Sequence, residues 1–204
     1  MTGLFTVMLV LFVLTFKWFK EREERLQEVA TRYQKIVELE EALQRLDESP
    51  YFAFEAENKR YELEVPVQFG QWEYTIPTPY HQKLINAGKQ LQALLEGIDD
   101  NIANELDIKY LVIVEGMAAK DPKDARLNRD PTFIRQTYNL SYQRALALAT
   151  LWRENGIVLD SNQVELIIAG SGIYGAGRYL KRNEEGKNRR FLIQIIPKTG
   201  QLEE

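Results

Sequence analysis

The chain has 204 residues, enough for one ordinary domain plus further elements, and its formal net charge is -4 at pH 7. It has no cysteine and one histidine, which excludes disulfides, cysteine-based metal sites and the common triads built on histidine. The negative charge, without a basic stripe interleaved with aromatic residues, argues against nucleic acid as a partner. We therefore expect a protein that is not an enzyme and has neither a cofactor nor a metal site.

The chain begins with the apolar run MTGLFTVMLVLFVLTF, followed at once by Lys-Trp-Phe-Lys. As a helix the run covers roughly 24 Å, against ~30 Å for the hydrocarbon core of a bilayer. It lacks the basic flank and small-residue cleavage site of a signal peptide, and a buried core helix would not usually be followed by an interfacial anchor. We expect residues 1–20 to form a single transmembrane helix whose first turn lies at or beyond Met1.

The orientation of this span is not settled by charge. Lys17, Lys20, Arg22 and Arg25 follow the apolar run, and a literal positive-inside count would keep the rest of the chain in the cytoplasm.

Residues 21–49 are predicted to form an amphipathic helix, because apolar residues recur every three or four positions. This stripe consists of Leu26, Val29, Tyr33, Ile36, Leu39, Leu43 and Leu46. It predicts either a parallel coiled-coil homodimer or a lone helix packed on its own domain. The helix should end at Ser49-Pro50, since proline halts a helix.

Residues 50–204 have the alternating pattern of a compact α+β domain. Strands are expected in YELEVPVQF, IKYLVIVEG, QVELIIAG and RRFLIQIIP, and helices in HQKLINAGKQLQALLEGI and NLSYQRALALATLWRENG, with a long loop over residues 120–135. The resulting order, β-α-β-α-β-β, predicts two helices on a four-stranded mixed sheet.

A glycine-rich stretch follows the third expected strand. Gly170, Gly172 and Gly175 have the G-x-G-x-x-G spacing of dinucleotide-binding loops. No apolar helical face comes after them, and Ile195 stands where the carboxylate that binds ribose should be. These glycines are therefore interpreted as shaping an ordinary loop.

Four short motifs occur in a familiar order: VEG at 114–116, LSYQRA at 140–145, AGSG at 169–172 and NRR at 188–190. With them, residues 61–197 resemble the OmpA-like peptidoglycan-binding domain shared by OmpA, Pal and MotB. In that family a strand ends in G-H-T-D, a helix opens with L-S-x-x-R-A, and N-R-R leads into the last strand. The resemblance implies a domain that binds the bacterial cell wall.

The same resemblance implies a ligand site in which an aspartate and an arginine grip the zwitterionic diaminopimelate of peptidoglycan. Arg144 matches the arginine, whereas Ala119 stands at the aspartate position. Either Asp121 or Asp124 substitutes from the loop, or the site rests on Arg144 alone and binds the wall weakly. The alternative for Arg144 is a surface arginine that caps a neighbouring loop. Residues 188–190 are expected to orient the last strand rather than to touch ligand.

A single span, a coil and an OmpA-like domain together resemble the layout of stator B subunits, namely MotB and the B subunit of the Zorya anti-phage system. This implies a single-pass protein of the bacterial inner membrane, with a periplasmic domain, a homodimeric state and a multi-span partner like MotA or ExbB. The family's ion-carrying aspartate would fall just upstream of Met1. We expect either an upstream extension that encodes it or a relative that conducts no ions; the rival is a passive envelope anchor or adaptor.

Overall fold

The computed structural model describes residues 2–70, 72–102, 109–161 and 164–198. The chain divides into two compact units, Met1–Glu40 and Glu41–Glu204, and each is considered by itself.

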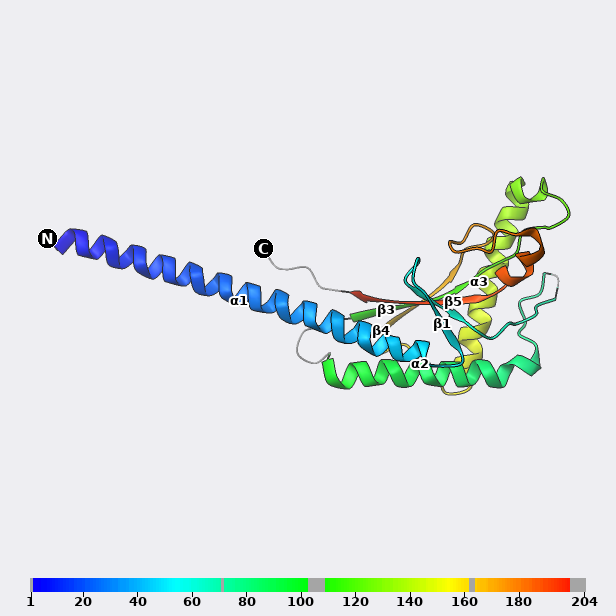
Figure 1. Cartoon of the computed structure of the whole chain (residues 1–204), viewed down its shortest axis with the longest axis horizontal. Helices are drawn as coiled ribbons and strands as arrows, with labels where there is room; N and C mark the ends of the chain where they lie inside the picture. Colours follow the sequence, from blue (N-terminus) through cyan, green and yellow to red (C-terminus); the bar gives the residue numbers. More distant parts are fainter. Residues whose placement is uncertain (1, 71, 103–108, 162–163, 199–204) are drawn as a thin grey trace. The chain divides into compact units, whose positions relative to one another are not determined.

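The first unit is formed by helix α1 (Thr2–Asp47) up to Glu40, and the last residues of this helix belong to the second unit (Figure 1). Within it, Gly3–Thr31 is long and apolar enough to cross a membrane, and none of that segment is buried in the structure. Its polar part begins with two exposed ion pairs, Lys17–Glu21 at 3.8 Å and Lys20–Glu24 at 3.9 Å. An apolar helix surface without cover is typical of a segment that lies in lipid.

The predicted apolar stripe lies on this same helix. Leu26, Val29 and Tyr33 are 62%, 46% and 69% exposed, whereas Leu46 is only 3% exposed and belongs to the core of the second unit. The side chains of Leu39 and Leu43 lie outside the described residues. The helix ends at Asp47, two residues before Ser49, close to the predicted stop.

The second unit contains one mixed sheet in the order β1-β2-β5-β3-β4. The strands are β1 (Phe52–Glu55), β2 (Arg60–Leu63), β3 (Lys109–Gly116), β4 (Val164–Gly170) and β5 (Phe191–Lys198). Only β3 and β4 run parallel. The α+β class is confirmed, but the sheet has five strands rather than four, because the short FAFE segment pairs with β2 as a hairpin.

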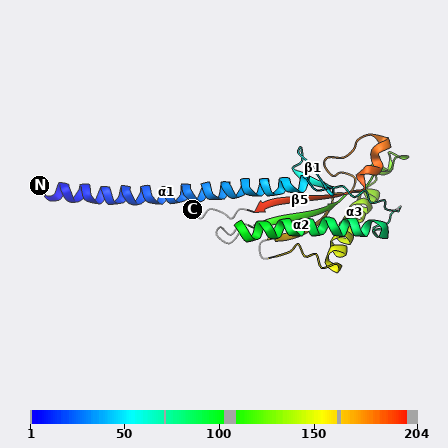
Figure 2. The same cartoon turned by 60° about the horizontal axis from the view of Figure 1, so that its bottom comes forward.

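Two long helices, α2 (His81–Ile102) and α3 (Pro131–Glu154), lie on one side of this sheet (Figure 2). The buried faces of α2 and of strands β3 and β5 supply a core that includes Leu84, Leu91, Val112 and Ile193. Trp152 is 1% exposed and donates its indole N–H to the carbonyl oxygen of Leu84 at 2.7 Å, which ties α3 to α2. Among the described residues, short 3-10 helices lie in the connections, namely η1 (Thr78–Tyr80), η3 (Leu127–Arg129) and η4 (Arg182–Asn188).

The predicted boundaries differ most from the structure in two places. The helix expected from Asn139 begins eight residues earlier, since Pro131 occupies its first turn and the Asp130 side chain caps it by accepting from Phe133 N at 2.8 Å. The segment from Glu64 to Phe69 alternates between exposed and buried residues but lies outside strand β2, which ends at Leu63. Its backbone bonds locally instead, for example from Val67 N to the carbonyl oxygen of Val65 at 2.7 Å.

Candidate functional site

Two glycines allow helix α3 to lie directly on the ends of the parallel strands. Gly116 and Gly170 are paired in the β3–β4 register. A Cβ on Gly116 would stand 2.1 Å from the carbonyl oxygen of Ser141, and one on Gly170 would stand 2.3 Å from the backbone nitrogen of Tyr142. Both approaches exclude any larger residue. Gly116 of the VEG motif and Gly170 of the AGSG motif therefore serve helix packing at the ends of two strands.

Arg144 lies on the buried face of α3, three and four residues after Ser141 and Leu140. It is 3% exposed, which is unusual for arginine. Its Nε donates to the carbonyl oxygen of Glu73 at 3.0 Å, and its guanidinium carbon lies 4.3 Å from the centre of the Phe69 ring. Within the described part of the chain this is its only hydrogen bond, and no carboxylate there forms an ion pair with it.

Arg144 lines a cavity of about 220 Å³. The cavity is bounded by the loop after β2, the loop after β3, helix α3 and the residue that precedes Arg190. These elements contribute Gly70, Trp72, Ala118, Ala119, Lys120, Asp121, Pro122, Phe133, Thr137, Leu140, Arg144 and Arg189. At its wall, the Trp72 and Phe133 rings meet edge to face with centroids 5.6 Å apart. Trp72 has a φ of 60°, a left-handed conformation that is rare for a bulky residue.

The cavity carries excess positive charge. Burial lowers the pKa of Arg144 to about 10, and the positive charge of Arg189 lowers it in the same direction. Arg144 nevertheless remains charged at neutral pH. A guanidinium with unused N–H groups binds a carboxylate through two parallel hydrogen bonds, so this geometry favours an anion.

The acidic residues named from the sequence form no ion pair with Arg144. Asp121 lines the cavity, but its Oδ1 accepts backbone hydrogen bonds from Lys123 and Asp124, both at 2.7 Å. These bonds lower the pKa of Asp121. Asp124 is not a lining residue, and its carboxylate accepts from Arg126 N at 2.9 Å. Ala119, which was aligned with the aspartate of the OmpA-like family in the sequence, lies on the cavity wall.

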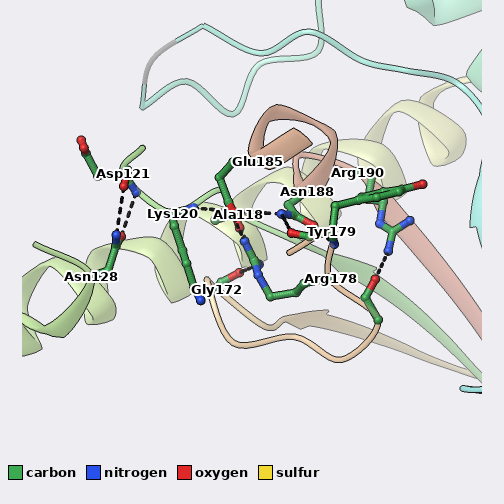
Figure 3. Close-up of polar contacts among 11 residues, drawn as sticks. Ala118, Lys120, Asp121, Asn128, Gly172, Arg178, Tyr179, Glu185, Asn188 and Arg190 are labelled. Atoms are coloured by element: carbon green, nitrogen blue, oxygen red, sulfur yellow. Dashed lines mark hydrogen bonds and ion pairs between the residues drawn. The ribbon is translucent and has the colours of Figure 1, made fainter. Parts of the chain in front are cut away.

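A buried polar network holds the loop after β3 in place (Figure 3). Arg178 pairs with Glu185 and donates from Nη1 to the carbonyl oxygen of Ala118 at 2.8 Å. Glu185 also accepts from the backbone N–H of Lys120 at 2.7 Å and from Asn188 Nδ2 at 3.0 Å. The cavity wall from 118 to 120 is thus fixed by side chains that do not themselves line the cavity.

The N-R-R motif has two roles rather than one. Asn188 is buried and exchanges hydrogen bonds with the backbone of Tyr179, while Arg190 pairs with Glu62 and donates to the carbonyl oxygen of Gly177 at 2.7 Å. Both therefore orient the chain before β5, as expected. Arg189, between them, is exposed and lines the cavity beside Arg144, so the sequence interpretation missed it.

Two larger hollows lie elsewhere on the second unit. One, of about 480 Å³, is mostly apolar and includes Tyr74, His81 and Leu146. The other, of about 540 Å³, is lined by residues 62–68, Tyr179, Gly186, Lys187, Arg189 and Arg190. The cation of Arg190 is already paired with Glu62. The smaller cavity is the better candidate for a binding site because its buried charge has no counter-ion among the described residues. In that part of the chain, no group of three or more histidine, aspartate or glutamate residues could hold a metal ion.

No protein-family model matches the sequence, and no curated protein matches it. Several solved structures resemble the fold. The OmpA-like domain of FopA1 from Francisella tularensis is 17% identical over 68% of this chain and 71% of its own, with a TM-score of 0.38. The cell wall anchor of the T6SS from Pseudomonas aeruginosa is 16% identical over 78% of this chain and 95% of its own, with a TM-score of 0.43. The C-terminal domain of Helicobacter pylori MotB is 15% identical over 68% of this chain and 88% of its own, with a TM-score of 0.38. These are distant likenesses of fold, so the chemistry of the cavity rests on its own residues.

Proposed function

We propose that this protein is a membrane-anchored subunit that tethers to the bacterial cell wall, without catalysis, through the cavity around Arg144. The observation that carries the proposal is a nearly buried, charged guanidinium with one hydrogen bond, beside the second guanidinium of Arg189. Keeping such a charge out of water is costly unless a ligand pairs with it. Carboxylates of wall peptides are suitable anions, and the apolar part of α1 supplies a membrane anchor.

More specifically, we propose that the chain is the B-type subunit of an ion-driven stator complex, with its domain in the periplasm and a MotA- or ExbB-like subunit as partner. The wall-bound domain would then hold the complex still while the partner does work. The second candidate is a passive envelope anchor or adaptor, which the same cavity would serve. Co-purification of a multi-span membrane protein with the full chain supports the stator, whereas recovery of this chain alone favours the anchor.

Wall binding can be tested by sedimenting the full chain, in detergent, with purified peptidoglycan sacculi. Arg144→Met should abolish co-sedimentation, because methionine fills the space but supplies no hydrogen bonds to a carboxylate. Arg153→Met is the matched control, since Arg153 is exposed on the same helix and lies outside the cavity. Equal binding by the two variants, with both folded, would exclude this cavity as the wall site.

Self-association through the stripe on α1 is part of the stator proposal. Because the chain has no native cysteine, a single introduced thiol reports on one position without background. Val29→Cys should form an oxidised dimer readily in membranes, since a parallel seam would bring the two copies of this position together. Glu28→Cys, on another face of the helix, should do so poorly. Equal crosslinking at both positions would contradict the seam.

The periplasmic orientation can be tested in the same way. Val158 is 58% exposed on the second unit, so Val158→Cys offers an accessible label there. A membrane-impermeant maleimide should modify it in cells whose outer membrane alone is permeabilised. Modification only after the inner membrane is lysed would place the domain in the cytoplasm, as the literal positive-inside count has it.

A further inference from the structure

The cavity is unbalanced in its charge. Its lining includes three basic residues, Lys120, Arg144 and Arg189, against a single acidic one, Asp121. The positive charge that acts on Arg144 comes from Arg189, and no carboxylate among the described residues forms an ion pair with Arg144. A ligand that brings a second positive charge into this space would be repelled by two guanidinium groups and would find few acceptors.

One carboxylate oxygen of the single acid is already engaged. The Oδ1 atom of Asp121 accepts the backbone N–H groups of Lys123 and Asp124 and so closes the turn of residues 121–124. The backbone of Asp121 is held as well, since its N–H donates to Asn128 Oδ1 at 2.8 Å and its carbonyl oxygen accepts from Asn128 Nδ2 at 2.9 Å (Figure 3). Turning Oδ1 toward a ligand ammonium would break the turn.

A second acid, Glu73, lies near the cavity but does not line it. Its carboxylate covers Gly70, where an added Cβ would stand 2.2 Å from Oε2, and its backbone carbonyl is the acceptor for Arg144. The side chain is exposed. It therefore lies at the rim, in water, where an ion pair contributes little.

From this arrangement we infer that the cavity selects a carboxylate with no free ammonium group beside it. The inference rests on the proposed function, since it names the ligand class of the same site. Two guanidinium groups can hold one carboxylate, or two carboxylates of one ligand, through forked hydrogen bonds. An amine that has been acylated into a peptide bond meets the condition because it carries no charge. The site would thus take a cross-linked wall peptide in preference to one with a free amine.

Two ligands of equal chain length test this directly. Pimelate and meso-2,6-diaminopimelate share a seven-carbon chain with terminal carboxylates, and differ only in the two ammonium groups of the second. Titration calorimetry of the full chain in detergent at neutral pH should show pimelate binding about tenfold more tightly or better. The comparison needs no variant, so it stands even where a substitution fails to fold.

Ala119→Asp sharpens the test, because it places a carboxylate on the cavity wall. It should reverse the preference, with diaminopimelate gaining about tenfold and pimelate losing affinity. Ala125→Asp is the matched control: it adds the same charge in the same loop at an exposed position that does not line the cavity. It should leave pimelate the tighter ligand.

The outcomes separate this inference from the proposed function. Equal or tighter binding of diaminopimelate to the natural chain would overturn the inference, as would binding of neither ligand by a chain that still sediments with sacculi. Preference for pimelate by a chain that does not sediment with sacculi would support the ligand class and overturn the wall-tethering proposal.

Discussion

Two nearly buried arginines in the same domain have opposite surroundings. The side chain of Arg178 is 6% exposed and meets the carboxylate of Glu185 and the carbonyl oxygens of Ala118 and Gly172. Arg144 is 3% exposed and has one carbonyl oxygen, one aromatic face and a second guanidinium nearby. Burial lowers the pKa of both, but for Arg178 the charge of Glu185 opposes the shift. A compensated buried cation belongs to the fold, whereas an uncompensated one is a candidate for pairing with a ligand.

The largest expected effect comes from breaking the compensated pair. Arg178→Ala leaves Glu185 buried without its cation and should lower the free energy of unfolding by about 3–5 kcal/mol. Replacing both partners, as Arg178→Met with Glu185→Leu, should recover much of that loss, since no charge is then left unpaired. Urea unfolding of the single and double variants measures both. A single variant as stable as the natural chain would mean that the network does not hold the cavity wall.

Arg144→Met should not destabilise the protein but should abolish binding. It removes a buried charge without leaving a partner charge behind, so stability should be unchanged or rise by about 1–2 kcal/mol. For a domain of this size that is about 2–8 °C in melting temperature. At the same time sacculus binding should fall to background. A drop of several degrees in melting temperature would show that Arg144 is a structural residue like Arg178.

Arg189→Gln should weaken binding less than the loss of Arg144. Arg189 is exposed, so its contribution to anion binding is screened by water and should be about 0.5–1 kcal/mol, or a few-fold in affinity for pimelate. Arg182→Gln, an exposed change seven residues earlier, is the control. If Arg189→Gln abolishes binding while Arg182→Gln does not, Arg189 rather than Arg144 is the main anion ligand.

The smallest effect concerns Asp121, whose pKa in the folded state is lowered by the backbone hydrogen bonds of Asp124 and Lys123. Because the folded pKa is depressed, its contribution to stability is present above the ordinary aspartate range near pH 4 and is lost as the pH falls further. Asp121→Asn keeps an acceptor for the turn but removes the titration. The melting temperature should therefore fall slightly less between pH 6 and pH 3 for this variant than for the natural chain. Glu57→Gln, an exposed change elsewhere, should leave the pH dependence of the melting temperature unchanged.

Much of the fold followed from local patterns. The apolar spacing of residues 81–98 and the continuous apolar runs in β3, β4 and β5 predicted those elements correctly, because burial of one face imposes a period on the chain. Strand β1 was missed, since four residues are too few to show a period. Helix α3 begins earlier than predicted, because Pro131, which is typical of a loop, also fits the first turn of a helix.

The candidate site, like the fold, was predicted from the sequence only in part. The sequence by itself determined the apolar N-terminal helix and the α+β class, since each depends on residues close together in the chain. Arg144 was singled out as a candidate by the resemblance of the LSYQRA motif to a known family. Only the tertiary structure decided that Arg189 lines the cavity, unlike its neighbours Asn188 and Arg190, and that Asp121 is engaged in its own turn. The reason is physical: whether a charge is compensated depends on partners distant in sequence. The acceptor of Arg144 is 71 residues away and the carboxylate of Arg190 is 128 away, and no local pattern reports on them.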